Sequence, residues 1–397
     1  MKLLSVDDAR ARMLGAAVAL ETEIVTLDQA LGRVLAETVS ATRSQPPFAA
    51  SAMDGWAVRS VDCPGRLKIT GESAAGGGYD GVLGAGESVR IFTGAAVPAG
   101  ADAVVIQEDA TREGDHVVVP AVNDARNIRP AGQDFKAGDL LLPAGVRLDP
   151  WRLSLAASAG QPSLLVARRP TVAILSTGEE VVEPGCSPGP FQIFNSGTTA
   201  LGALFRSWGA EVIALKPVGD EVEATADAVR GVACDVVVTL GGASVGDYDL
   251  VKPAMALLGL EMIVESVAVR PGKPTWFGVL GDGRRLLGLP GNPASAMVCA
   301  ELFFRPLLAA MQGAAPTVPM IKARTAVAMA ANGGREHWMR ARLSHADDGA
   351  VVSTPFADQD SSLVTVFASA DALLRRPAGA PAAAPGDPVD VLPLARA

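Results

Sequence analysis

A glycine-rich loop near the middle of the chain combines groups that bind anions with groups that bind cations. Residues 241–249 read GGASVGDYD and follow an apolar run. Their ligand-binding groups belong to Gly241, Gly242, Ser244, Gly246, Asp247 and Asp249. Glycines bring backbone N–H groups close to an oxyanion, whereas paired carboxylates repel a bare phosphate unless a divalent cation such as Mg²⁺ accompanies it. The loop therefore predicts an anion bound with Mg²⁺, as in a nucleotide. A plain strand-to-helix turn is the alternative for such a loop taken alone.

Two more polar loops follow apolar runs. Residues 176–180 read STGEE and include Thr177 and Glu180. Residues 290–295 read PGNPAS and supply Pro290, Gly291, Asn292 and Ser295. In an open parallel sheet, ligands bind outside the carboxyl ends of the strands. We therefore expect all three loops to line one crevice.

Positive charge is concentrated in a short turn. The segment RPGKP places Arg270 and Lys273 beside prolines that restrict the backbone. The whole chain has 34 Lys and Arg against 43 Asp and Glu, a formal net charge of −9. This balance argues against a broad surface for nucleic acid or acidic membranes, so an anion must be bound locally. We expect Arg270 and Lys273 to belong to that local site, with a solvated turn as the alternative.

Two aspartates lie in turn-like loops on either side of a β-rich stretch. Asp54 belongs to PFAASAMDGWAV, and Asp134 belongs to NIRPAGQDFKAGDLL. Asp-Gly pairs and loops rich in Gly and Pro are turn signals. From the residues alone, neither aspartate is assigned to catalysis.

The elements that must position the central loops alternate between strand and helix. Residues 172–175 form a continuous apolar run, and Ser196 is expected to cap a helix that closes at Gly209. Further strands are expected at 211–216, 235–240 and 286–289, and a further helix at 221–232. This order predicts a mostly parallel sheet wrapped by helices. Short alternating strands predict a β-rich block at 65–122 and a small β-domain after residue 319.

Targeting and cysteine signals favour a cytosolic protein. Cys63, Cys186, Cys234 and Cys299 lie far apart without a CxxC pair, which argues against a thiolate metal site. The opening segment is too acidic for a secretory signal and is expected to form an amphipathic helix that uses Leu4, Leu14 and Val18. We expect no apolar run of membrane-spanning length.

Eight motifs, in order along nearly the whole chain, resemble a known family. They read PFAASAMDGWAV, RIFTGAAVPAGADAVVIQED, IRPAGQDFKAGDLLLPAG, ILSTGEE, GGASVGDYD, RPGKPTWFG, GLPGNPAS and GREHWMR. The chain resembles molybdopterin molybdenumtransferases of the MoeA type, which are similar to the gephyrin E domain and its plant counterpart. The resemblance implies that molybdenum from molybdate is inserted into adenylylated molybdopterin, with release of AMP and with Mg²⁺ as cofactor.

The resemblance also implies roles for individual residues. It assigns the Mg²⁺ ligands to Glu180, Asp220 and Asp249. It assigns catalysis to these and to Asp54, Thr93, Asp134, Arg270 and Lys273. The molybdate cage would draw on Arg270, Lys273, Ser295, Ser361 and an arginine of GREHWMR, either Arg335 or Arg340. The pterin nucleotide would be bound by Thr177, Gly241, Gly242, Ser244, Gly246, Pro290, Gly291 and Asn292. Many relatives have lysine where Arg270 stands.

The implied architecture is a multidomain α/β protein. Residues 1–44 and 135–168 would form an elongated N-terminal lobe, into which 45–134 insert a β-rich lobe. Residues 169–314 would form the three-layer α/β domain with an open, mostly parallel sheet, and 315–397 a C-terminal β-barrel. The resemblance further implies a cytoplasmic homodimer in which the β-rich lobe closes over the site. A molybdopterin adenylyltransferase and acceptor molybdoenzymes would be its protein partners, with neither nucleic acid nor membrane among them.

Two other functions compete with the transferase. A molybdopterin adenylyltransferase would share the α/β domain, but such enzymes lack the β-rich lobe that carries Asp54. A cofactor-binding or scaffold protein would keep the fold without turnover. Such a protein would not need the acidic and basic groups that this chain retains.

Overall fold

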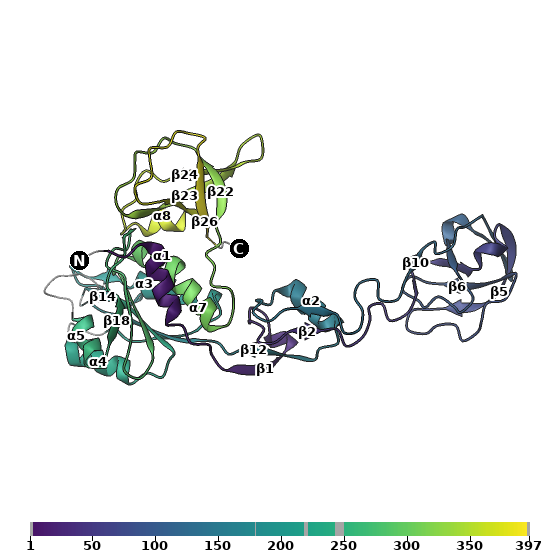
Figure 1. Cartoon of the computed structure of the whole chain (residues 1–397), viewed down its shortest axis with the longest axis horizontal. Coiled ribbons are helices and arrows are strands. Elements are labelled where there is room, and N and C mark those ends of the chain that lie inside the picture. The colour runs from purple at the N-terminus through teal and green to yellow at the C-terminus, as the bar shows by residue number, and fades with distance from the viewer. Residues whose placement is uncertain (1–2, 179, 218–220, 243–249, 395–397) are drawn as a thin grey trace.

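The computed structural model describes residues 3–178, 180–217, 221–242 and 250–394. The molecule is elongated, with an α/β domain and a β-barrel together at one end, a small lobe in the middle and a β-rich lobe at the other end (Figure 1). The chain passes through the middle lobe on its way to the β-rich lobe and again on its way back.

The α/β domain is built on a six-stranded sheet with the order β16-β13-β17-β21-β20-β18. Its strands are β13 (Thr171–Ser176), β16 (Glu211–Ala214), β17 (Val236–Leu240), β18 (Glu261–Val264), β20 (Trp276–Val279) and β21 (Arg285–Leu289). The first four strands of that order are parallel, and β20 and β18 are added antiparallel. The expected mostly parallel sheet is confirmed.

Alternating side chains of the central strands pack on opposite faces of this sheet. Val172 and Ile174 pack in one core with Phe205, whereas Leu175 packs in another with Val251. The helices on the first face are α1 (Val6–Gly15), α3 (Ser196–Ser207), α6 (Pro293–Cys299) and α7 (Arg305–Met311), and those on the second are α4 (Val222–Arg230) and α5 (Val251–Ala256). The domain therefore has three layers.

Two helices differ in detail from the sequence-based expectation. Asn195, rather than Ser196, is the N-cap of α3, and its side chain accepts a hydrogen bond from the backbone N–H of Thr198. Both residues are good N-caps, so the sequence alone does not separate them. Helix α1 ends at Gly15 and buries Val6, Ala9 and Met13, while Val18 is exposed beyond its end. The predicted face of Leu4, Leu14 and Val18 was therefore wrong.

A long apolar helix lies in the core of the α/β domain. Helices α6 and α7 are joined by η4 (Ala300–Phe304), a π-helical segment. The run Pro293–Met311 is long and apolar enough to cross a membrane, which corrects the expectation that no such run exists. Because 83% of it is buried by the rest of the protein, it is the core helix of this domain.

The middle lobe combines two segments that are far apart in the sequence. Strand β1 (Thr22–Thr26) pairs with β12 (Ser163–Ala167), and β2 (Val39–Ser40) pairs with β11 (Leu140–Leu142). Helix α2 (Pro150–Ser158) and the short η1 (Leu27–Gln29) complete it. Its apolar residues form a core of their own around Leu35, Leu148 and Val166.

The β-rich lobe has a six-stranded sheet with the order β7-β4-β6-β5-β9-β8. Its elements are β3 (Ala50–Ser51), β4 (Gly55–Val58), η2 (Ser60–Asp62), β5 (Gly65–Ser73), β6 (Glu87–Ile91), β7 (Ala103–Ile106), η3 (Gln107–Asp109), β8 (Thr111–Glu113), β9 (His116–Val119) and β10 (Ile128–Arg129). A neck of two chain segments joins it to the middle lobe, and Gln45 and Phe135 form an isolated antiparallel bridge there.

The C-terminal strands close into a barrel. These strands are β22 (Ile321–Thr325), β23 (Glu336–His345), β24 (Val351–Pro355), β25 (Ala372–Arg376) and β26 (Pro388–Pro393), with α8 (Val364–Ala368) beside them. Pairing of β23 with both β24 and β25 closes the ring, as expected. Strand β19 (Val269–Arg270) pairs in parallel with β23 and so connects the basic turn to the barrel.

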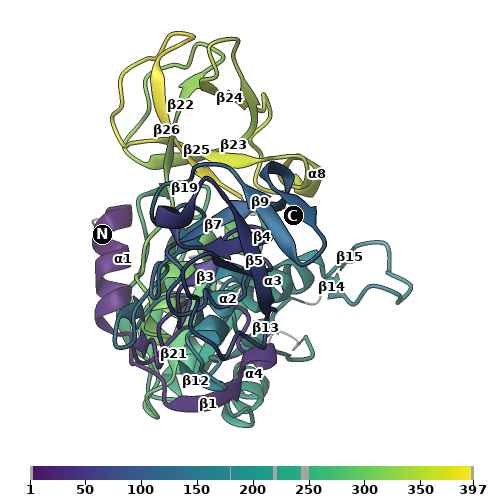
Figure 2. The same ribbon diagram turned by 90° about the vertical axis from the view of Figure 1, so that its right-hand side faces the viewer.

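A narrow arm projects from the α/β domain (Figure 2). Its base is the parallel pair β14 (Val181–Val182) and β15 (Ile193–Phe194). Phe191, two residues before β15, is 90% exposed.

Candidate functional site

Loops after three neighbouring strands meet at the carboxyl edge of the α/β sheet. The backbone N–H of Thr177 donates to Leu240 O at 3.1 Å, and that of Gly241 donates to Leu289 O at 3.2 Å. A Cβ on Gly291 would lie 3.5 Å from the Cα of Gly241. The structure thus brings Thr177, Gly241 and Gly291 together beside the buried Pro290.

The backbone at Gly241 and Gly242 requires glycine. Their φ angles are +96° and +58°, in the left-handed region that side chains disfavour. A Cβ on Gly242 would lie 2.2 Å from Cγ2 of Val251, so the loop is pressed against helix α5. Successive residues of this kind form a concave backbone that can present N–H groups to an anion.

The predicted magnesium ligands are only partly within the described residues. Glu180 is exposed beside the crevice, and its carboxylate lies over Gly178. Asp220, Asp249, Ser244 and Gly246 lie outside the described residues. Among the residues that the structure describes, no three His, Cys, Asp or Glu side chains gather in a metal-binding group. Glu180 nevertheless offers the hard oxygen donors that Mg²⁺ prefers. Its assignment as a magnesium ligand remains a prediction.

The basic turn lies between the α/β domain and the barrel. Arg270 and Lys273 are exposed, while Gly272 between them is buried. In the β19–β23 pair, Arg270 stands opposite His337. The turn therefore presents its two cations beside the barrel strand that carries GREHWMR.

The barrel is attached to the third crevice loop. Asn292 Nδ2 donates to Ser361 Oγ at 2.9 Å, and the backbone N–H of Ala294 donates to Ser361 O at 3.2 Å. Asn292 is the N-cap of α6, as expected, and Ser295 is buried in the first turn of that helix. Ser361 and the PGNPAS loop are thus in contact.

The two arginines of GREHWMR differ in burial. Arg335 is exposed, whereas the whole of Arg340 is buried. Nη2 of Arg340 donates to Asp360 O at 2.9 Å. Its Nε and Nη1 have no hydrogen-bond partner among the described residues. Buried donors of this kind are costly unless another group satisfies them, so Arg340 is the better suited of the two to bind an oxyanion.

His337 is a residue that the sequence analysis missed. Burial first, and then the positive charges of Arg270, Arg340 and Arg335, lower its pKa to about 4. The imidazole is therefore neutral at physiological pH. The only earlier hint was its place inside GREHWMR, because its closeness to Arg270 depends on the β19–β23 pairing.

In the β-rich lobe, Asp54 and Thr93 form a close pair. Oδ1 of Asp54 accepts hydrogen bonds from the Thr93 backbone N–H and from its hydroxyl, both at 2.7 Å. The backbone bond first, and then the hydroxyl, lower the pKa of Asp54. The carboxylate is thus kept ionised on an exposed loop.

Arg90, which was not predicted, supports this pair. Its guanidinium carbon lies 5.2 Å from the ring centre of Trp56 and 4.9 Å from that of Phe92. It donates to Gly55 O and to the side chain of Gln107, whose backbone N–H in turn donates to Asp54 O. The signal available in the sequence was the arginine in RIFTG.

Asp134 lies apart from that pair, on the neck. Its backbone N–H donates to Gln45 O at 2.9 Å. The neck and the β-rich lobe are at the opposite end of the molecule from the α/β crevice (Figure 1). Within one chain, the structure therefore does not bring Asp54, Thr93 or Asp134 to the crevice.

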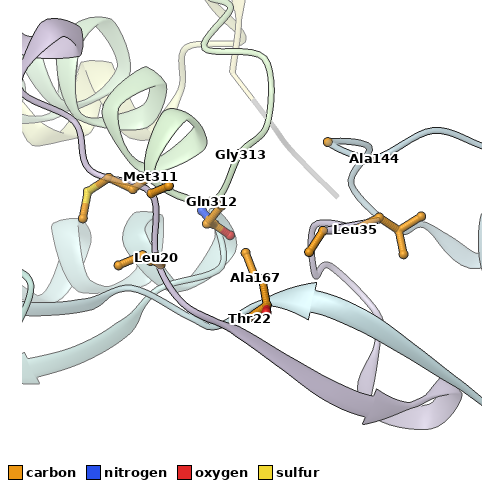
Figure 3. Close-up of a pocket in the computed structure, with 11 residues that line it drawn as sticks. Leu20, Thr22, Leu35, Ala144, Ala167, Met311, Gln312 and Gly313 are labelled. Atoms are coloured by element: carbon orange, nitrogen blue, oxygen red, sulfur yellow. The ribbon is translucent and has the colours of Figure 1, made fainter. Parts of the chain in front are cut away.

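Two cavities of about 280 Å³ each lie away from the predicted residues. One lies where the α/β domain meets the middle lobe, and Leu20, Leu35, Met311 and Gln312 are among its lining residues (Figure 3). The other lies between α1, the linker and the barrel, beside Trp338. Neither contains a residue of the predicted site.

Comparison with known proteins gives matches along almost the whole chain. Residues 4–160 match the MoeA N-terminal region (domains I and II). Residues 173–310 match a family described as a probable molybdopterin binding domain, and residues 322–394 match the MoeA C-terminal region (domain IV).

Individual relatives agree with these matches. A Staphylococcus epidermidis protein named molybdopterin molybdenumtransferase is 31% identical over 98% of this chain and 95% of its own length. A protein of the same name from Haemophilus influenzae is 37% identical over 78% of each chain. The crystal structure of a molybdopterin biosynthesis MoeA protein from Pyrococcus horikosii covers 99% of both chains at 30% identity, with a TM-score of 0.82.

Proposed function

The chain belongs to the MoeA family of molybdopterin molybdenumtransferases, and from this premise we propose that it transfers molybdenum from molybdate to adenylylated molybdopterin, releasing AMP. Insertion of molybdenum into molybdopterin, a step of molybdenum cofactor biosynthesis, follows from the family itself. Adenylylated molybdopterin as the substrate and AMP as a product are our proposal.

The meeting of the three loops at the carboxyl edge of the α/β sheet is the observation that carries this proposal. Gly241 and Gly242 supply a concave backbone suited to the pyrophosphate of a pterin nucleotide, and Thr177 and Gly291 lie beside it. The Asn292–Ser361 contact places the barrel at the same edge.

Molybdate would bind at the junction of the basic turn and the barrel. Arg270, Lys273 and Arg340 supply positive charge there, and Ser295 and Ser361 supply hydroxyl groups. The unpartnered donors of buried Arg340 favour it over exposed Arg335 for the oxyanion. The compact dianion and the pyrophosphate could then meet between the two domains.

Magnesium would be held by Glu180 together with Asp220 and Asp249. These three carboxylates offer only oxygen donors, as Mg²⁺ prefers. A bound Mg²⁺ would offset the negative charge of the pyrophosphate oxygens. The protein's own contribution is to orient the nucleotide between the glycine-lined crevice and the basic turn.

A homodimer would complete the site. Asp54, Thr93 and Asp134 are separated from the crevice of their own chain (Figure 1). If they act on the same substrate, they must reach the crevice of a second copy. Such an arrangement accounts for functional groups at both ends of an elongated molecule.

Release of AMP tests the proposal directly. The purified protein is incubated with adenylylated molybdopterin and Mg²⁺, with and without molybdate. We expect AMP release that depends on molybdate and stops when Mg²⁺ is chelated. If the full-length protein binds the pterin but releases no AMP across a range of divalent metals, the binding-protein or scaffold alternative replaces the transferase.

A further inference from the structure

A buried hydroxyl and a buried thiol lie directly beneath the basic turn. Thr275 and Cys299 are both 0% exposed. Oγ1 of Thr275 lies 2.8 Å from Gly272 O and 3.0 Å from Sγ of Cys299. The backbone N–H of Thr275 also donates to Gly272 O at 3.0 Å. The carbonyl oxygen of Gly272 thus accepts hydrogen bonds from both the hydroxyl and the backbone N–H of Thr275.

The protons in this cluster can be assigned from its chemistry. Burial raises the pKa of the Cys299 thiol to about 12, so it is neutral and carries its proton. The Thr275 hydroxyl has one proton, and a carbonyl oxygen can only accept. With the Thr275 O–H donated to Gly272 O at 2.8 Å, the Cys299 S–H has three acceptors within reach: Thr275 Oγ1 at 3.0 Å, Gly272 O at 3.8 Å and Pro271 O at 3.9 Å.

The sulfur atom of Cys299 also limits how closely the backbone of the turn can approach the core. Gly272 has φ +112°, and a Cβ there would lie 2.1 Å from Sγ of Cys299. The backbone of the turn therefore rests on the thiol with no room for a side chain. Cys299 itself is the last residue of α6, immediately before the π-helical η4, so it belongs to the rigid core helix.

The inward carbonyl determines where the next amide points. In a trans peptide, the C=O and the following N–H point in opposite directions. With Gly272 O directed into the core, the N–H of Lys273 faces outward. The turn then offers a backbone donor beside the Arg270 and Lys273 side chains, whereas its two prolines offer none.

We propose that Thr275 and Cys299 are positioning residues for molybdate, because they hold the basic turn with the Lys273 amide facing the bound oxyanion. The inference rests on the proposed function and adds residues to which neither the resemblance nor the comparisons assign a role. Neither residue touches the substrate. Substitution of either residue should therefore change the affinity for molybdate more than it changes kcat.

The test compares substitutions at these two positions in the full-length protein. Thr275→Val keeps the shape and removes the hydroxyl, and we expect it to weaken molybdate binding in calorimetry by about 5- to 20-fold. The KM for molybdate should rise by a similar factor while kcat stays within about twofold. Thr275→Ser, which keeps the hydroxyl, should restore wild-type behaviour. Cys299→Ala removes the support under Gly272 and should weaken molybdate binding in the same direction.

Thr239→Val is the matched control. Thr239 is also fully buried in the α/β sheet, but its hydroxyl has no hydrogen-bond partner among the described residues. Its replacement should leave molybdate binding unchanged. Wild-type affinity in both Thr275→Val and Cys299→Ala would overturn the inference while leaving the proposed function standing. Failure of the wild-type protein to bind molybdate would instead reject the proposed function, and this inference with it.

Discussion

Asp54 has a fixed position and a lowered pKa, and one substitution can distinguish a chemical role from a structural role in the turn. Replacing it by asparagine keeps an oxygen that can accept from Thr93 but removes the charge. We expect Asp54→Asn to lower kcat for AMP release by about 100-fold, the scale of an acid–base or electrostatic contribution. Binding of adenylylated molybdopterin, measured at equilibrium, should change little. A collapse of binding would identify Asp54 as a structural turn residue.

His337 predicts a dependence of stability on pH. Its pKa is about 4 in the folded protein against an ordinary value of 6.5, so between these values the unfolded chain binds the extra proton. The free energy of unfolding should therefore fall as the pH drops from 6.5 to 4, by about 1–3 kcal/mol for this group. His337→Gln should flatten that slope in denaturant titrations. His345→Gln, which removes an exposed histidine from the same strand, is the control and should leave the slope in place.

At the residue scale, a motif that is continuous in the sequence identifies candidate groups without their surroundings. The segment RPGKP predicts a local anion site, and the structure has both of its cations exposed beside the barrel, while their membership of the site stays a prediction. Arg90, His337 and Cys299 were missed because the residues that they contact come from other strands or other segments. The stacking of Arg90 on Trp56, for example, depends on the antiparallel register of β4 and β6. Cross-strand contacts of this kind cannot be derived from one segment alone.

At the scale of elements, the turn after β17 is expected to require glycine at position 242. A methyl group on Gly242 would face both the positive φ and the side chain of Val251. We expect Gly242→Ala to cost about 1–3 kcal/mol in unfolding experiments and to weaken pterin nucleotide binding. The comparison is Gly283→Ala, where φ is also positive but a Cβ would meet nothing within 4 Å. That change should cost about 1 kcal/mol and leave binding intact. Equal effects at the two glycines would show that packing against Val251 is unimportant.

Elements with an unambiguous pattern were predicted well from the sequence. The run at 172–175 lies within β13, and the expected helix at 221–232 contains α4. The errors lie where neighbouring residues are almost equally suited to begin or end a helix, as at the N-cap Asn195 of α3 or at the end of α1. The π-helical turn at 300–304 has no sequence signal of its own, and all five of its residues are buried.

At the scale of the whole molecule, the separation of the two sets of functional residues predicts complementation between chains. We expect protein carrying Asp54→Asn and protein carrying Arg270→Gln each to be nearly inactive. After the two are mixed and subunits are exchanged, mixed dimers would contain one site with neither substitution. Activity should return to about a quarter of the wild-type value, because half of the dimers are mixed and each has one intact site. A mixture that stays inactive after verified exchange would place both residues in a site within one chain.

The discontinuous middle lobe marks the limit of local prediction. Its strand pairs join Thr22 with Ala167 and Ser40 with Leu140, residues separated by a whole lobe in the sequence. No periodicity in either segment identifies its partner. Only the resemblance to a known family suggested this arrangement, and the exact limits of the four regions remain a prediction.

The neck has a consequence for how such a chain can change over time. The backbones at Gln45 and Phe135 lie side by side. The chain between these two residues, which forms the β-rich lobe, therefore begins and ends at one place on the rest of the protein. A different module whose ends are equally close could be grafted there without altering the pairing of the strands behind it. In that sense, the β-rich lobe is a replaceable module on a constant scaffold.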